Sequence, residues 1–312
     1  MSSIVALAET PGRIEKLFLN QGNQLSPNGI YAVNFYSLGL PHTVIIDDWL
    51  PLTNAITGKP TTMFANVGED GSLWAPLLEK AFAKYHGNYS HIQGGDSRTA
   101  AKTLSGAPSF SVEHMPKTLE THWDTLVKHL ADGNIATVVT NSKKSDKHKM
   151  KNGLFYNHVY TVLETYVSKY GDKLIKMRNP HGEDSYTGDW SDNDFNWTTL
   201  SRKEQAKYNI KANDGIFWID HKNFFDSFKF TFFTFDNTNW SNAYFLKLND
   251  DSAEKNPAKY QGTLPWCGAN CTRHILTLKS SVTQTVYLTA HTWDERGKAK
   301  SCDEGEEYYH TI

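Results

Sequence analysis

Two stretches of this 312-residue chain decide its fold: Gly153-Leu154-Phe155-Tyr156-Asn157-His158-Val159-Tyr160-Thr161 and Met177-Arg178-Asn179-Pro180-His181-Gly182-Glu183. Residues 158–163 and 173–177 are rich in β-branched, aromatic and apolar side chains, which favour strands. The two runs follow one another directly and predict an antiparallel hairpin. If residues 166–171 form the connection, Thr165 faces Asp172, and counting back along the ladder places His158 opposite Asn179.

A histidine beside an asparagine is the base half of a cysteine-nucleophile site. In such a site the imidazole takes the proton of the thiol, and the asparagine amide fixes the ring and its tautomer. The alternative is that His158 and Asn179 are structural, because a short motif by itself is only a hypothesis. The surrounding sequence favours the catalytic interpretation.

The segments around this pair resemble the calpain family of cysteine proteases. His158-Val159-Tyr160-Thr161 is similar to the family's His-Ala-Tyr-Ser/Thr strand, and Arg178-Asn179-Pro180 with Gly182 is similar to its Arg-Asn-Pro-Trp-Gly. Four further segments are similar to family segments in the same order: residues 44–51, 73–84, 186–192 and 213–219. The resemblance extends over about residues 1–225.

The resemblance implies an α+β fold with three parts. A papain-like calpain protease core is made of an incomplete helical subdomain, residues 1–95, and a β-rich subdomain, residues 96–227. A C-terminal antiparallel β-sandwich, residues 228–312 and possibly incomplete, follows the core. It implies a cysteine-type endopeptidase that cuts protein or peptide substrates by Cys-His-Asn chemistry, with His158 as base and then acid, and Asn179 as the residue that orients it.

Local patterns predict the elements of these parts. Helical spacing of apolar residues predicts helices over 73–86 and 119–130, and β-rich runs predict strands over 44–46 and 135–140. The expected sandwich depends on four runs in which apolar and polar residues alternate, at 230–235, 243–246, 274–278 and 285–290. A membrane surface or another protein is the contact that we expect for this sandwich.

The cysteines lie in the wrong part of the chain for this chemistry. Cys267, Cys271 and Cys302 are the only three, and all follow the protease-like segments. Residues 1–9 resemble the stretch just after the family's cysteine, so we expect a truncated and therefore inactive form of an active protease. A start inside that helix would also expose Ile4, Val5 and Leu7. The alternative is a non-catalytic calpain-like protein that binds a peptide or a partner.

Gly94 and Gly95 are the candidate substrate-binding residues. They stand where the family has a glycine pair that lines the substrate cleft, and glycine lets an extended peptide approach the main chain closely. A plain turn is the alternative.

Calcium is the cofactor that the resemblance implies. Asp192 and Asp214 match two of the family's ligand positions, but Ile216, Ser185 and Leu73 stand where the family has glutamates, so tight binding is not expected. The two aspartates are then expected to cap turns. We assign no metal ligands from the sequence, because Cys267-x3-Cys271-x2-His274 is loose spacing without a defined fourth ligand. A metal-dependent hydrolase of another class that uses His158 is a third alternative.

His181 departs from the family pattern. It replaces a tryptophan that shields the histidine–asparagine hydrogen bond, which predicts a wetter and weaker pair.

Composition argues against several other classes of protein. The net charge of −2 gives no basic field for nucleic acid, and no apolar run approaches the length of a signal peptide or a membrane span. Three cysteines do not make a disulfide framework, so we expect a cytoplasmic protein. The lysine-rich stretch at 142–151 is expected to be a solvated loop, with gating of the cleft as a second interpretation.

Overall fold

The computed structural model describes residues 2–19, 24–37, 39–53, 60–68, 70–141, 143–208, 213–238, 240, 283, 285 and 287. The chain divides into two compact units, and every helix and strand given below belongs to the unit that contains residues 1–239. Among the described residues, none of the helices combines the length and the hydrophobicity needed to span a bilayer.

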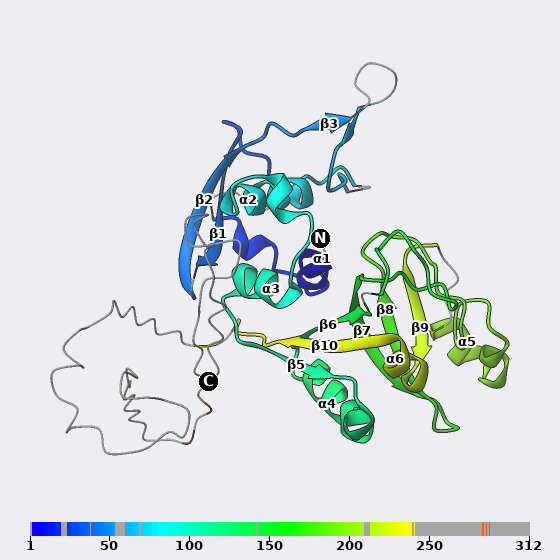
Figure 1. The fold of residues 1–312 in the computed structure, drawn as a ribbon. Coiled ribbons are helices and arrows are strands. Elements are labelled where there is room, and N and C mark those ends of the chain that lie inside the picture. The colour runs from blue at the N-terminus through cyan, green and yellow to red at the C-terminus, as the bar shows by residue number, and fades with distance from the viewer. Residues whose placement is uncertain are drawn as a thin grey trace, which may run out of the picture. The chain divides into compact units, whose positions relative to one another are not determined.

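The first part of the chain packs helices against a two-stranded hairpin (Figure 1). Its elements are α1 (Ser2–Ala8), η1 (Glu15–Leu17), β1 (Ile30–Ser37), β2 (Leu40–Asp47), β3 (Leu52–Thr53), β4 (Thr61–Thr62), α2 (Trp74–Tyr85), η2 (Tyr89–Ile92) and α3 (Ser97–Ser105). Val33 and Phe35 of β1 are completely buried beneath α2, whose Leu78 is also inaccessible to solvent. The expected helix at 73–86 is thus confirmed as α2, and the expected strand at 44–46 lies within β2.

The second part is built on one six-stranded antiparallel sheet. Its elements are β5 (Ser109–Glu113), η3 (Pro116–Thr118), α4 (Leu119–Ala131), β6 (Ile135–Thr140), β7 (Val159–Val167), β8 (Lys173–Arg178), η4 (Phe195–Thr199), α5 (Arg202–Tyr208), β9 (Ile216–Asp220), α6 (His221–Ser227) and β10 (Phe228–Thr234). The strand order is β5-β10-β6-β7-β8-β9. The predictions of a helix at 119–130 and a strand at 135–140 are confirmed.

The two faces of this sheet have separate cores, because successive residues of a strand point to opposite faces. On β9, Phe217 and Ile219 pack in the larger core with residues of α4 and α6. Trp218 between them joins a smaller tryptophan-rich core with Trp190 and Trp197. The mixed helix and sheet content agrees with the predicted α+β protease core.

One strand lies in a different place from the prediction. The run at 230–235 was expected to open the sandwich, but β10 pairs with β5 on one side and with β6 on the other. This strand therefore belongs to the six-stranded sheet, and its assignment to the sandwich is wrong. Alternation of apolar residues shows that a strand is half-buried, but not which sheet it joins. The runs at 243–246, 274–278 and 285–290 lie outside the described residues except for isolated positions, and the domain boundaries stay predictions.

The register of the β7–β8 hairpin also differs from the prediction. Thr165 pairs with Ile175 and not with Asp172, and the register shifts once more between Val162 and Glu164. The connection is closed by Ser168, whose N–H donates to the carbonyl of Asp172 at 2.9 Å. The prediction fails at the turn itself, because β7 continues to Val167, which pairs with Lys173, so the connection is formed by residues 168–172 and not 166–171. The β-bulge further along then shifts the register again.

Contacts of α1 connect the first part of the chain to the sheet. The helix packs against α3 and against β6 and β7. The Ser3 hydroxyl donates to the carbonyl of Ser97 at 3.1 Å, and Glu9 forms an ion pair with Arg178 at 2.8 Å. Ile4 and Leu7 are only 4% and 5% exposed, so the expectation that they would lie open is wrong.

Candidate active site

The backbone of His158 is fixed to the end of β6. The Thr140 N–H donates to the carbonyl of His158 at 3.0 Å, and the His158 N–H donates to the Thr140 hydroxyl oxygen at 3.0 Å. That hydroxyl in turn donates to the carbonyl of Phe155 at 2.8 Å. The sequence predicted the strand that contains Thr140 but gave this residue no role, because the contact joins segments 18 residues apart.

Asn179 is held directly after the end of β8. Its N–H donates to the carbonyl of Gly215 at 2.7 Å, and its carbonyl accepts from the N–H of Gly182 at 3.0 Å. Gly215 has φ +78°, and a Cβ there would lie 2.8 Å from the Asn179 oxygen. Only glycine tolerates both the backbone angle and this approach, so the asparagine depends on Gly215 for its place.

The side chains of His158 and Asn179 meet despite the altered register. His158 Nε2 lies 3.0 Å from Asn179 Oδ1. The same oxygen accepts from the His181 N–H at 3.1 Å, and Asn179 Nδ2 donates to the carbonyl of Glu183 at 2.9 Å. Because the amide nitrogen is committed to a carbonyl, its oxygen faces the imidazole and can only accept. His158 therefore carries its proton on Nε2, and Nδ1 keeps a free lone pair.

Burial keeps this imidazole neutral. His158 is 7% exposed and Asn179 1%. Desolvation lowers the pKa of His158 to about 4; the bond to Asn179 opposes this effect and the charge of His181 adds to it. The ring centroids of His158 and His181 are 4.4 Å apart. The expectation that His181 leaves the pair wet is thus wrong in this structure, since both partners are buried.

Gly94 and Gly95 lie between η2 and α3 and are both exposed. Gly95 has φ +149°, and a Cβ on Gly94 would meet nothing within 4 Å. Asp96 follows them and caps α3 by accepting from the Arg98 N–H at 2.8 Å. Their role in binding substrate stays a prediction.

Residues 1–233 match the domain described as "Calpain family cysteine protease". The chain belongs to the calpain family.

Curated calpains resemble the chain over about two thirds of its length. A calpain-type cysteine protease ADL1 of Oryza sativa subsp. japonica is 29% identical over 229 residues, which cover 71% of this chain and 10% of that protein. Calpain-14 of Homo sapiens is 31% identical over 209 residues, covering 66% and 29%. Calpain-9 of Rattus norvegicus is 32% identical over 209 residues, covering 64% and 29%. The matched region thus spans between a tenth and three tenths of these relatives.

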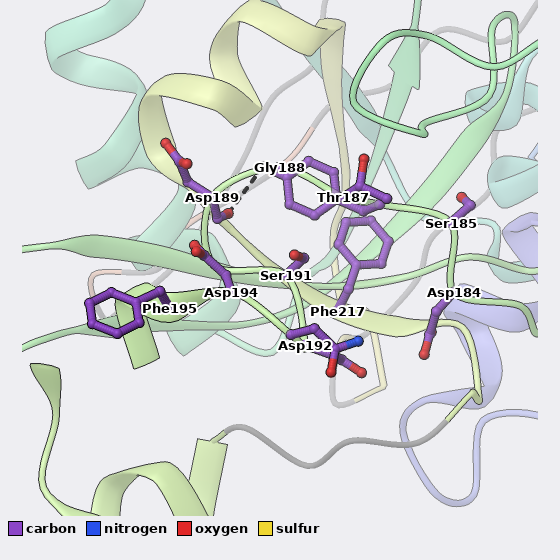
Figure 2. A pocket seen from close by; sticks show the side chains of 12 residues that line it. Asp184, Ser185, Thr187, Gly188, Asp189, Ser191, Asp192, Asp194, Phe195 and Phe217 are labelled. Atoms are coloured by element: carbon purple, nitrogen blue, oxygen red, sulfur yellow. Dashed lines mark hydrogen bonds between the residues drawn. The ribbon is translucent and has the colours of Figure 1, made fainter. Parts of the chain in front are cut away.

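An acidic pocket of about 550 Å³ lies beside β9 in this calpain-family chain (Figure 2). Its carboxylates come from Asp184, Asp189, Asp192 and Asp194. In Figure 2 Asp184 and Asp189 lie on opposite sides of the pocket. Burial raises the pKa of Asp184, and the nearby charge of Asp214 raises it further. Burial and a neighbouring like charge both favour the protonated form of a carboxyl group.

The described residues give no support to a multi-carboxylate calcium site. Among them, no group of three or more His, Cys, Asp or Glu side chains is placed to hold a metal ion. Asp214 Oδ1 accepts from the Ile216 N–H at 2.9 Å, so this aspartate caps a turn as expected. Calcium prefers six to eight oxygen ligands. The calcium prediction therefore gains no support from this pocket, and no step below depends on it.

A second group of imidazoles lies beside the same sheet, with His122 fully buried and His114 and His221 partly buried, and sequence reasoning missed it. Thr231 Oγ1 of β10 lies 2.8 Å from His114 Nε2 and 2.9 Å from His122 Nε2. His122 Nδ1 lies 3.0 Å from His221 Nε2, and His114 Nδ1 lies 3.3 Å from the carbonyl of Phe225. No sequence signal predicts the group, because its members are up to 117 residues apart.

The carbonyl of Phe225 sets the direction of every bond in this group. A carbonyl only accepts, so His114 carries its proton on Nδ1 and accepts at Nε2 from the Thr231 hydroxyl. The hydroxyl oxygen then accepts from Nε2–H of His122. His122 Nδ1 in turn accepts from Nε2–H of His221. All three imidazoles are neutral in this arrangement.

Proposed function

We propose that this chain carries the base and the orienting amide of a calpain-type cysteine endopeptidase that cuts protein or peptide substrates. The observation that carries the proposal is the bond from His158 Nε2–H to Asn179 Oδ1, which leaves Nδ1 of a neutral imidazole free. A histidine held in this way is ready to accept the proton of a thiol.

Each residue of the pair has one task in the proposed reaction. His158 Nδ1 takes the thiol proton, the thiolate attacks the peptide carbonyl, and the resulting imidazolium returns the proton to the leaving amine. Asn179 holds the ring in one tautomer and one orientation during both transfers. The asparagine oxygen also accepts from the His181 N–H at 3.1 Å, which helps to fix its direction.

The thiol must come from outside residues 1–266, since that region has no cysteine. We propose that it belongs to residues that precede this sequence in the active protein, because residues 1–9 resemble the stretch after the family's cysteine. The packing of α1 against β7, the strand that begins after His158, supports this placement. By the same reasoning, the 312-residue chain alone has no peptidase activity.

The test extends the chain by the in-frame codons upstream of Met1. The extended protein should react with a biotinylated peptidyl epoxide, which alkylates an activated thiol. Labelling should be lost in His158→Ala and should persist in His42→Ala, a control at an exposed histidine of β2. A codon other than cysteine at the expected position, or labelling that ignores His158, would count against the proposal.

A non-catalytic peptide- or partner-binding protein is the second candidate function. The absence of any thiol from residues 1–266 beside an intact histidine–asparagine pair favours it. Peptide binding that needs Gly94 and Gly95 and is unchanged by His158→Ala would support this candidate. Calcium dependence and a cytoplasmic location stay predictions. Titration of the purified protein with calcium and fractionation of cells would test them.

A further inference from the structure

A strongly basic segment, residues 143–151, is attached directly to the backbone that holds His158. The segment leaves the sheet after Thr140, whose hydroxyl binds the His158 N–H. It returns at Asn157, whose N–H donates to the carbonyl of Asn141 at 2.9 Å. Its two ends are therefore fixed within a few residues of the proposed base.

Backbone hydrogen bonds hold the returning half of this segment. The Met150 N–H donates to the carbonyl of Leu154 at 2.7 Å, and the Tyr156 N–H donates to the carbonyl of His148 at 2.9 Å. The backbones of Lys149 and Phe155 also pair as an isolated antiparallel β-bridge. Leu154 is completely buried in the core of the sheet. The basic segment thus has a defined place beside His158, which a freely solvated loop would lack.

The charge of the segment is concentrated and unneutralised. It contains five lysines against the single carboxylate of Asp146: Lys143, Lys144, Lys147, Lys149 and Lys151. All five are exposed, and in the described part of the chain none of them is ion-paired. The chain as a whole carries a net charge of −2, so the positive charge is a local feature.

Aromatic rings bring part of this charge toward the site. The Lys149 ammonium lies 4.9 Å from the ring centroid of Phe155, and that of Lys144 lies 5.7 Å from the ring of Tyr156. The Phe155 ring is itself 5.8 Å from the ring of His158. Aromatic faces attract ammonium groups, so these contacts hold two of the cations on rings that precede His158 in the chain, while the charge of the segment that acts on His158 itself is that of Asp146.

We propose that the basic segment makes the site at His158 select peptides that carry aspartate or glutamate. This inference rests on the proposed function, because it names the substrate class of the same site. Each exposed charge pair is weak alone, but a cluster of one sign raises the local concentration of an acidic ligand and speeds its encounter. Such an effect is screened by salt, whose Debye length is about 8 Å at physiological ionic strength.

The experiment measures peptide binding to the purified chain by fluorescence anisotropy. One fluorescein-labelled decapeptide alternates alanine with glutamate, and its partner has glutamine at every glutamate position. At low salt the glutamate peptide should bind roughly tenfold more tightly, and the advantage should largely vanish at about 300 mM NaCl. Lys147→Glu with Lys149→Glu should abolish the preference. Lys203→Glu with Lys222→Glu, two exposed lysines of α5 and α6, should retain it.

Three outcomes would overturn the inference. The peptides could bind equally, the control pair could lose the preference as fully as the test pair, or neither peptide could bind. Tighter, Lys149-dependent binding of a thymidine oligonucleotide without discrimination between the peptides would also overturn it, and would assign the segment to nucleic acid. The epoxide labelling tests the base and the thiol independently, so failure here is distinguishable from failure of the proposed function.

Discussion

Two sets of imidazoles lie beside the six-stranded sheet, one around His158 and one around His122. Burial lowers the pKa of both of these histidines, but they differ in which ring nitrogens are free. Desolvation lowers the pKa of His158 to about 4 and that of His122 to about 3. His122 is completely buried, and both of its nitrogens are bonded inside the protein. His158 is bonded to Asn179 through Nε2 alone, which leaves Nδ1 for a proton from outside.

This difference shows that a depressed histidine pKa does not by itself identify a catalytic base. Perturbed pKa values gather at active sites, but structural networks perturb them as well. What separates His158 from His122 is an unbonded nitrogen: Nδ1 of His158 can accept a proton, whereas both nitrogens of His122 are already bonded inside the protein.

The largest predicted effect is the loss of stability in His122→Ala. This change opens a cavity and removes a partner from both Thr231 and His221, so it should cost about 3 kcal/mol of unfolding free energy. His158→Ala should cost about 1 kcal/mol, since Asn179 Oδ1 keeps the His181 N–H as a donor. Urea unfolding of both variants at pH 7.5 measures the two costs. Equal costs would remove the distinction between the two sets.

The second prediction concerns acid. The folded-state pKa values of His114 and His221 are lowered to about 4, and that of His122 to about 3, chiefly by burial. At His221 the charge of Lys173 adds to this effect and Asp220 opposes it. Below the unfolded value of about 6.5 the unfolded chain binds protons that the folded chain excludes. Stability is therefore complete above about pH 6.5 and falls as the pH drops toward 4.

Each neutral buried histidine adds up to about 1.4 kcal/mol per pH unit to this fall. Repeating the urea titrations between pH 7.5 and 4.5 gives the slope for the wild-type chain, and His122→Phe should reduce it. Stability independent of pH across that range would contradict the assignment of neutral imidazoles.

The sequence predicted the meeting of His158 and Asn179 for a partly wrong reason. Counting from an assumed connection at residues 166–171 gave the wrong register, because β7 continues to Val167, which pairs with Lys173, yet the side chains meet. The family segments carried the correct information, because they record which residues come together without passing through the ladder. Local periodicity was equally reliable for α2 and α4, where apolar spacing follows the buried face.

Contacts between distant segments could not be predicted in this way. The sequence of residues 228–234 does not indicate that this strand lies between β5 and β6. A strand with alternating apolar and polar residues would suit a sandwich equally well. The hydrogen bond from the His158 N–H to Thr140 and the β-bridge between Lys149 and Phe155 are also tertiary contacts, which local sequence patterns do not predict. The lysine run therefore looked like ordinary solvated surface until its neighbours were known.

A smaller effect is expected in the tautomers at neutral pH. Long-range ¹H–¹⁵N correlation spectra should show His158, His122 and His221 protonated on Nε2, and His114 on Nδ1. Asn179→Ala removes one hydrogen bond, worth about 1 kcal/mol, which corresponds to about a fivefold change in the tautomer ratio of His158. The spectrum of His122 should not change. A His158 already mixed in the wild-type chain would contradict the orienting role of Asn179.

The smallest effect is a shift of the His158 pKa in His181→Gln. The two rings lie 4.4 Å apart, and the charge of His181 lowers the pKa of His158. Glutamine keeps the backbone N–H that Asn179 accepts but carries no charge, so the pKa should rise by a few tenths of a unit, or about 0.4 kcal/mol. An NMR titration resolves this shift. His148→Gln, at an exposed histidine of the basic segment, is the matched control. If His148→Gln raises the pKa of His158 as much as His181→Gln does, the adjacent ring of His181 has no special influence on that pKa.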